Sequence, residues 1–214
     1  MPKRSFFHSI LDFLFFPIRA LTLFDKDFFI FCSLRSERYF YVSKEVVGRC
    51  LDVGCGNDNL FIKKFRRGNG KGIDVFHYKG LSKEQVFQSL TVFPFSSGEF
   101  STVTFIATIN HIPKKERLLE IKESYRCLSN KGKIIITMGN PIAEIAVHKL
   151  VHFYDKYFHT SFDVDGERGM HHDESYYLTD KEITTLLKKG GFKNIRKKYF
   201  ITQWGLNHMF IANK

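Results

Sequence analysis

Short apolar runs alternate with amphipathic helical patterns along most of the chain from Cys50 onward. This alternation is typical of β-α-β units, in which helices cover both faces of a mostly parallel sheet. The last two runs follow each other with no helix between them, which predicts an antiparallel pair. The expected strands are residues 50–54, 71–75, 88–92, 103–107, 132–137, 192–199 and 202–212.

The helical patterns lie between these runs and carry their own start and stop signals. Thr179 and Glu182 form a capping-box sequence at the start of the last helix, and Gly190 ends it. Pro113 and Pro141 stand at the starts of two earlier helices. The expected helices are residues 57–67, 112–128, 142–153 and 179–189.

The first 24 residues are rich in Phe and Leu, but Asp12, Pro17 and Arg19 interrupt them. No apolar run approaches the ~20 residues that a membrane span needs, and the same interruptions argue against a signal peptide. Two interpretations stay open. The segment is either a helical arm that packs its Phe/Leu face on the domain or covers the active site, or an interfacial segment on anionic lipid, with Lys3, Arg4 and Arg19 at headgroup level.

We expect residues 1–47 to form this arm or lid and residues 48–214 to form one domain, because no linker or repeat divides the chain further. The formal charge of +11 favours an anionic partner, such as acidic membrane, nucleic acid or an anionic substrate. The four cysteines show no metal-ligand spacing. We therefore expect free thiols and a cytoplasmic protein, with peripheral contact at the inner face of the membrane as the alternative.

The run at residues 51–58 ends in Gly54 and Gly56, and an amphipathic segment follows at once. Such a strand-turn-helix unit lets a ligand approach the backbone and offers N–H donors to it. Asp74 follows eighteen residues after Gly56, at the end of the next apolar run. An acidic residue in this position can accept hydrogen bonds from ribose hydroxyls. The sequence therefore predicts a nucleoside-containing cofactor over this turn.

These residues resemble a known family. The segment Leu-Asp-Val-Gly-Cys-Gly with Asp74 is similar to the S-adenosylmethionine-binding start of class I methyltransferases, in particular the small "type 11" methyltransferases. The resemblance covers roughly residues 48–212 and implies a Rossmann-like, seven-stranded, mostly parallel sheet with one antiparallel strand near its edge. The further matching motifs, in the family's order, are Phe93-Pro94-Phe95, Glu99-Phe100, Asn110-His111-Ile112-Pro113, residues 123–128 and residues 178–192.

The resemblance implies S-adenosylmethionine as cofactor and a role for each matching residue. Asp52 should approach the cofactor's amino group, Asp74 the ribose, and the two residues after Asp74 the adenine. Asn57 and Asp58 stand where the family has a third glycine, and Ser89 where it has an acidic residue. The implied cofactor-binding residues are Asp52, Gly54, Cys55, Gly56, Asn57, Asp74, Val75, Phe76, Ser89, Leu90, Ala107 and Asn110.

His111 follows the fourth predicted strand, where the carboxyl ends of parallel strands form the ligand crevice. It is the candidate catalytic residue, as a general base or substrate-orienting group, and the alternative is a helix-capping or supporting histidine. We expect no metal, because no Glu lies between His148 and His152 as it does in zinc hydrolases.

The favoured function is methyl transfer to a small-molecule or lipid-like acceptor. The alternatives are an RNA or protein methyltransferase that uses the basic surface, or a non-catalytic binding protein. A dinucleotide oxidoreductase fits poorly, because Asn59 occupies the position of that motif's third glycine.

Overall fold

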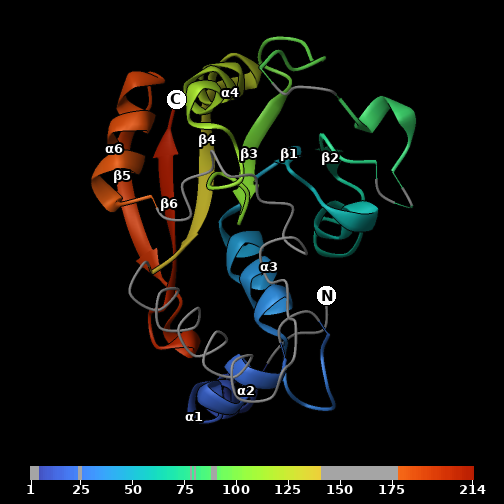
Figure 1. Cartoon of the computed structure of the whole chain (residues 1–214), viewed down its shortest axis with the longest axis vertical. Helices are drawn as coiled ribbons and strands as arrows, with labels where there is room; N and C mark the ends of the chain where they lie inside the picture. Colours follow the sequence, from blue (N-terminus) through green and yellow to red (C-terminus); the bar gives the residue numbers. More distant parts are fainter. Residues whose placement is uncertain (1–4, 24–25, 78, 80, 88–90, 141–177) are drawn as a thin grey trace, which may run out of the picture.

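The fold comes from a computed structural model, which describes residues 5–23, 26–77, 79, 81–87, 91–140 and 178–214. Six strands form one mixed sheet in the order β2-β1-β3-β4-β6-β5 (Figure 1). β6 runs antiparallel to both of its neighbours, and the pairs among β2, β1, β3 and β4 are parallel. The strands are β1 (Cys50–Val53), β2 (Gly70–Ile73), β3 (Phe100–Ile106), β4 (Leu128–Gly139), β5 (Lys193–Tyr199) and β6 (Asn207–Asn213).

The predicted α/β class and the antiparallel strand next to the edge are confirmed, but the described sheet has six strands and not seven. The missing strand is the one expected at residues 88–92. Residues 88–90 lie outside the described part of the chain, and residues 91–92 form a bend. One parallel bridge, between Asp74 and Val86, continues the sheet beyond β2. The short 3₁₀ turn η3 (Lys83–Gln85) leads directly into that bridge.

Helices cover both faces of the sheet, and each face has its own apolar cluster. On one face, α4 (Lys114–Cys127) and α6 (Asp180–Lys189) pack over a core that includes Phe105, Ile121 and Leu187. On the other, α3 (Leu34–Glu45) packs with Phe61 and Ile135. The capping box of α6 is present as predicted, with Thr179 as N-cap. The predicted helix at residues 142–153 lies outside the described residues.

The helix predicted at residues 57–67 is wrong. The structure has a 3₁₀ turn, η1 (Asn57–Asn59), and then one π-helical turn, η2 (Phe61–Phe65). Asp58 and Asn59 take left-handed backbone angles, with φ of 60° and 54°, which an α-helix does not accept. The first helical turn after β1 is therefore lost.

The N-terminal segment forms helices α1 (Phe6–Leu14) and α2 (Phe16–Thr22), at the end of the molecule opposite α4 (Figure 1). They pack on the connection between β5 and β6, which contains the 3₁₀ turn η4 (Ile201–Gln203). The Trp204 indole donates a hydrogen bond to the Phe13 carbonyl at 2.9 Å, and its ring contacts Phe16. β5 runs in the same direction as β4, because both are antiparallel to β6. The connection that follows β5 therefore lies at the carboxyl end of the parallel strands, and so does the arm.

A buried polar network anchors the arm. Arg19 is 1% exposed and donates to Glu37 and to the carbonyls of Asp12 and Cys32. Gln203 donates to the same Glu37 carboxylate at 2.9 Å. The placement of Arg19 at a lipid headgroup layer is therefore wrong, because its guanidinium is enclosed by protein.

Candidate active site

The turn after β1 is hydrogen-bonded to β2 and contains two glycines, each of which is required for a different structural reason. The N–H groups of Gly54 and Cys55 both donate to the Ile73 carbonyl. Gly54 has φ of 69°, and a Cβ there would collide with the Thr108 side chain. Gly56 has φ of 64°, but nothing lies within 4 Å of the place where its Cβ would be. Gly54 therefore serves packing, whereas Gly56 leaves open space that a ligand can occupy.

Asn57 and Asp58 stand where the family has a third glycine, and the left-handed backbone falls on Asp58 and the next residue, Asn59. Asp and Asn tolerate this conformation better than other side chains do. The Asp58 side chain is exposed, and so is that of Asn57. In this chain the residues that depart from the glycine pattern form a 3₁₀ turn with their side chains toward solvent at Asn57 and Asp58.

Asp74 links the glycine turn to the end of β2. Its carboxylate accepts the Gly56 N–H at 2.8 Å through one oxygen and the Phe76 N–H at 3.0 Å through the other. Each oxygen keeps a further lone pair that could accept a ribose hydroxyl. Val75 and Phe76, the expected adenine flanks, are both partly exposed apolar side chains beside this carboxylate. Ser89 and Leu90 lie outside the described residues.

Asp52 is a buried acid below the turn. Its carboxylate accepts a hydrogen bond from the Thr104 hydroxyl at 2.7 Å. Burial, with a smaller contribution from the negative charge of Asp74, raises the pKa of Asp52 to about 7. Burial also raises the pKa of the Cys55 thiol, so Cys55 acts as a small apolar side chain at this position and not as a nucleophile.

The end of β3 reaches the same turn. Ala107 has φ of 56°, a strained conformation for a residue other than glycine, and its N–H donates to the Thr137 hydroxyl at 2.8 Å. The next residue, Thr108, places its hydroxyl 3.3 Å from the Gly54 carbonyl. Asn110 and His111 follow, both half-buried, and the His111 N–H closes the turn on the Thr108 carbonyl.

Three threonines at this end of the sheet were not anticipated. Thr104 holds Asp52, Thr108 contacts Gly54, and Thr137 holds the Ala107 backbone. A threonine inside a strand that is buried on both faces is the signal that could have identified Thr104 and Thr137, because a buried hydroxyl needs a partner. Thr108 lies after β3 and carries no such signal.

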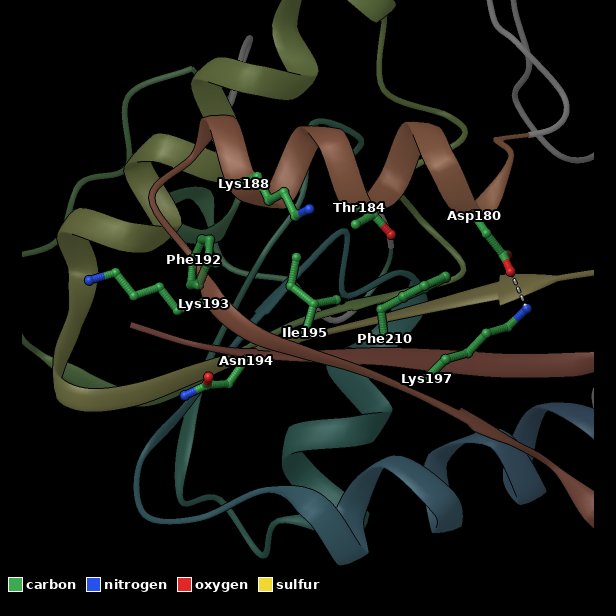
Figure 2. Close-up of a pocket in the computed structure, with 9 residues that line it drawn as sticks. All are labelled: Asp180, Thr184, Lys188, Phe192, Lys193, Asn194, Ile195, Lys197 and Phe210. Carbon is green, nitrogen blue, oxygen red and sulfur yellow. Dashed lines mark hydrogen bonds and ion pairs between the residues drawn. The ribbon is translucent and has the colours of Figure 1, made fainter.

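A second concave feature lies at the far edge of the sheet. Figure 2 shows a groove of about 580 Å³ between α6 and β5, lined by Lys188, Phe192 and Thr184, among others. The Lys197 ammonium on its wall is paired with Asp180 at 2.6 Å. In the sheet order, β3, β4 and β6 separate this groove from β1. It is therefore distinct from the glycine turn.

The described residues fit a nucleoside cofactor at the carboxyl ends of β1, β2 and β3. Gly56 leaves its surroundings open, Asp74 presents a carboxylate, and Phe76 exposes an aromatic face. Within the described residues neither Asp52 nor Asp74 forms an ion pair, so the site is electrostatically suited to a cationic ligand.

The methyltransferase-domain family model matches residues 29–197, most of the chain. No curated protein sequence matches the chain. Solved structures share its fold, among them a methyltransferase dependent on S-adenosylmethionine from Archaeoglobus fulgidus (TM-score 0.56, 13% identity, covering 85% of this chain and 93% of that one). A second, from Methanosarcina mazei, has a TM-score of 0.54 and 18% identity, and covers 81% of this chain and 96% of that one.

A third structure is the Burkholderia thailandensis 1,6-didemethyltoxoflavin-N1-methyltransferase, solved with 1,6-didemethyltoxoflavin and S-adenosylhomocysteine. Its TM-score is 0.55 at 11% identity, and the match covers 83% of this chain and 76% of that one. At such identities these structures establish the shared fold, and the family match establishes the class. The chain belongs to the methyltransferase-domain family. It is a class I enzyme, and its cofactor is S-adenosylmethionine.

Proposed function

We propose that this enzyme methylates a small-molecule or lipid-like acceptor in the cytoplasm. The observation that carries the proposal is that Gly56, Asp74 and the strained end of β3 come together at the carboxyl ends of the parallel strands. When bound, S-adenosylmethionine supplies a methyl group made electrophilic by its sulfonium. All four cysteines are free and buried, which supports a reducing compartment.

In this proposal each side of the turn holds one part of the cofactor. Asp74 accepts the ribose hydroxyls, and Val75 and Phe76 flank the adenine. The backbone from Gly54 to Gly56 carries the methionine part, and Asp52 attracts its amino group. Ala107 and Asn110 border the methyl group. The main support is that Asp74 already fixes the Gly56 N–H, so the two halves of the cradle are held together before a ligand binds.

The placement of basic side chains favours a small acceptor over RNA. One basic cluster lies on η2 and just after it, and η2 contacts β1 and β2; its members are Lys63, Lys64, Arg66 and Arg67. The second lies on β5 at the opposite edge of the sheet, and its members are Lys193, Arg196, Lys197 and Lys198. Arg196 and Lys198 are paired with Glu45 on α3. A phosphate backbone is bound by a continuous basic stripe, and these separated and partly paired clusters do not suit one.

His111 is proposed as the general base or as the group that orients the acceptor. It lies half-buried directly after the β3 turn, within reach of the crevice at the carboxyl ends of the strands. The His111→Ala variant should lose about 10²–10⁴-fold in turnover while it binds S-adenosylhomocysteine as the wild type does. Full turnover in this variant would remove the base role.

The acceptor class is tested with methyl-labelled S-adenosylmethionine and purified enzyme. The enzyme is incubated separately with a small-molecule extract, a lipid extract, total RNA and a protein fraction. Label in the small-molecule or lipid fraction supports the proposal. Label confined to RNA or protein contradicts it, and cofactor binding without transfer to any fraction would favour a non-catalytic binding protein.

A further inference from the structure

The two N-terminal helices are apolar on the outside and charged on the inside. Asp12 and Arg19 are the only charged residues of α1 and α2, and both are buried. The outward surface of these helices includes Phe6, which is 83% exposed, together with Phe7 and Leu14. A helix on the surface of a globular domain normally has the opposite arrangement. The outward surface therefore needs an apolar environment.

A turn beside the helices extends the same surface. Phe28 and Phe31 exchange two backbone hydrogen bonds, at 3.1 and 2.9 Å, and the residues between them form the tip. At the tip, Phe29 is 96% exposed and has a left-handed φ of 54°. The Phe31 ring packs against Phe15, where α1 meets α2. We call the exposed apolar residues of α1, α2 and this tip the apolar face.

Backbone pairing at the base of the tip lowers the cost of removing it from water. Its closing backbone groups pair with each other, and the backbone of the helices pairs internally. An apolar phase excludes segments with unpaired backbone groups, so this pairing is a requirement for insertion. The three consecutive apolar residues at positions 28–30 are exposed, and their contact with water is unfavourable.

The chemistry of the apolar face fits lipid better than a protein partner. A specific protein interface has a polar rim and roughly one hydrogen bond per 100–200 Å². The exposed residues of α1 and α2 carry no charge, and Asp27, which directly precedes the tip, is engaged by the Ser33 N–H and hydroxyl. By sequence, Asp25 is a second acidic residue on this side of the tip. By sequence, Lys3 and Arg4 precede α1 and Lys26 precedes the tip, as basic residues flank interfacial segments.

We propose that the apolar face docks on the surface of an anionic lipid bilayer, with its aromatic side chains at the level of the acyl chains and Lys26 among the headgroups. The contact is peripheral, and no helix among the described residues is long and apolar enough to cross a membrane. The arm lies at the carboxyl end of the strands, which suits the lipid-like acceptor of the proposed function, although membrane binding does not depend on methyl transfer.

Vesicle flotation with the full chain tests this docking. Wild-type protein should float with vesicles of phosphatidylcholine and phosphatidylglycerol, and more weakly with phosphatidylcholine alone. Phe29→Glu and Phe7→Glu should each weaken binding to the anionic vesicles at least about tenfold, because each places a charge in the contact. Leu119→Glu is the matched control, since Leu119 is a 47% exposed residue on α4, and this variant should bind as the wild type does.

Each variant is first shown to be folded by its thermal melt, and two independent sites on the apolar face guard against a single misfolded variant. Wild-type protein that does not bind anionic vesicles would overturn the proposal. Equal binding by the wild type and both Phe variants would do so too. A dimer seen by light scattering that Phe29→Glu dissociates, in protein that ignores vesicles, would instead assign the apolar face to a second copy of the chain.

Discussion

Two regions of the molecule each bury a pair of carboxylates, and they differ in whether a positively charged side chain lies beside the pair. In the N-terminal arm, Arg19 lies between Asp12 and Glu37 and contacts both. At the carboxyl end of the sheet, Asp52 and Asp74 have only a hydroxyl and backbone N–H groups as donors among the described residues. The first pair shares one cation, Arg19, whereas the second has no cation among the described residues.

We infer from this difference that the first pair is a structural network and that the second belongs to the proposed cofactor site. A buried charge without an opposite charge costs free energy, and such groups cluster where a protein binds or reacts. The uncompensated pair suits a ligand with positive charge, as S-adenosylmethionine has at its sulfonium and amino groups. The pair that shares Arg19 joins the arm to α3 and so holds the arm on the domain. Four changes test this contrast.

The largest effect should come from Arg19→Met. The variant leaves Asp12 and Glu37 buried without a cation, which should lower the free energy of unfolding by about 3–5 kcal/mol. Urea unfolding followed by Trp204 fluorescence measures it well, because Trp204 is the only tryptophan and contacts the arm. The control is Arg196→Met, which removes an exposed partner of Glu45 and should cost less than about 1 kcal/mol. Equal, small losses would show that the network does not hold the arm.

Asp52→Asn should change how stability depends on pH. The pKa of Asp52 is about 7 in the folded protein and lies near its ordinary value of 3.8 in the unfolded chain. Between these values the folded state binds the proton and the unfolded state does not, so stability falls as pH rises from 4 to 7. Asn does not titrate, so only the wild type loses stability in this way. From pH 4 to pH 7 the free energy of unfolding of the variant should rise relative to that of the wild type by up to about 4 kcal/mol.

Denaturant unfolding of both proteins at pH 4, 5.5 and 7, without cofactor, gives that difference directly. Because all other groups titrate in both proteins, the difference isolates position 52. A constant difference across the range would mean that Asp52 is ionised throughout, and the contrast between the two carboxylate pairs would then fail.

Asp74→Asn should weaken S-adenosylhomocysteine binding about 10–100-fold, since it removes a charged acceptor and places an amide beside the Gly56 N–H. Asp58→Asn is the matched control, because Asp58 is an exposed acid in the same turn. It should leave the affinity within about threefold. The affinities are measured by calorimetry. A larger loss from Asp58→Asn than from Asp74→Asn would reverse the roles of the two acids.

The smallest effect on stability is expected from a pair of glycine substitutions. Gly56 and Gly68 both have positive φ, 64° and 77°, and open space at the Cβ position. Replacing either with Ala should cost about 1–3 kcal/mol of stability through backbone strain. Only Gly56→Ala should also weaken S-adenosylhomocysteine binding, because its methyl group enters the space left for the ligand. Equal affinities in thermal-shift titrations of the two variants would contradict this.

Much of the sheet could be predicted from the chain because its central strands are short runs of mainly apolar and β-branched residues bounded by glycine and polar residues. Cys50–Val53 and the runs that became β3 and β4 are of this kind. The edge beyond β2 was harder, since residues 88–92 mix polar and apolar side chains without a clear period. The helix after β1 failed because two non-glycine residues, Asp58 and Asn59, adopt the left-handed conformation.

The site could be predicted where it rests on local motifs, and not where it rests on distant contacts. The position of Asp74 relative to Gly56 follows from a βαβ unit, but the hydrogen bond between them does not. The arm network joins Arg19 and Glu37 to Gln203, which lies 166 residues after Glu37. No periodicity reports such a pairing, and Arg19 therefore resembled a surface residue in the sequence.

The central claim is that the turn at Gly54–Gly56, with Asp74, is an S-adenosylmethionine site. Calorimetric titration of the wild-type protein with S-adenosylmethionine, S-adenosylhomocysteine and NAD tests it most directly. The account predicts one binding event per chain for the first two ligands, weakened in Asp74→Asn, and none for NAD. Binding of NAD alone, or equal binding of S-adenosylhomocysteine by the wild type and Asp74→Asn, would contradict it.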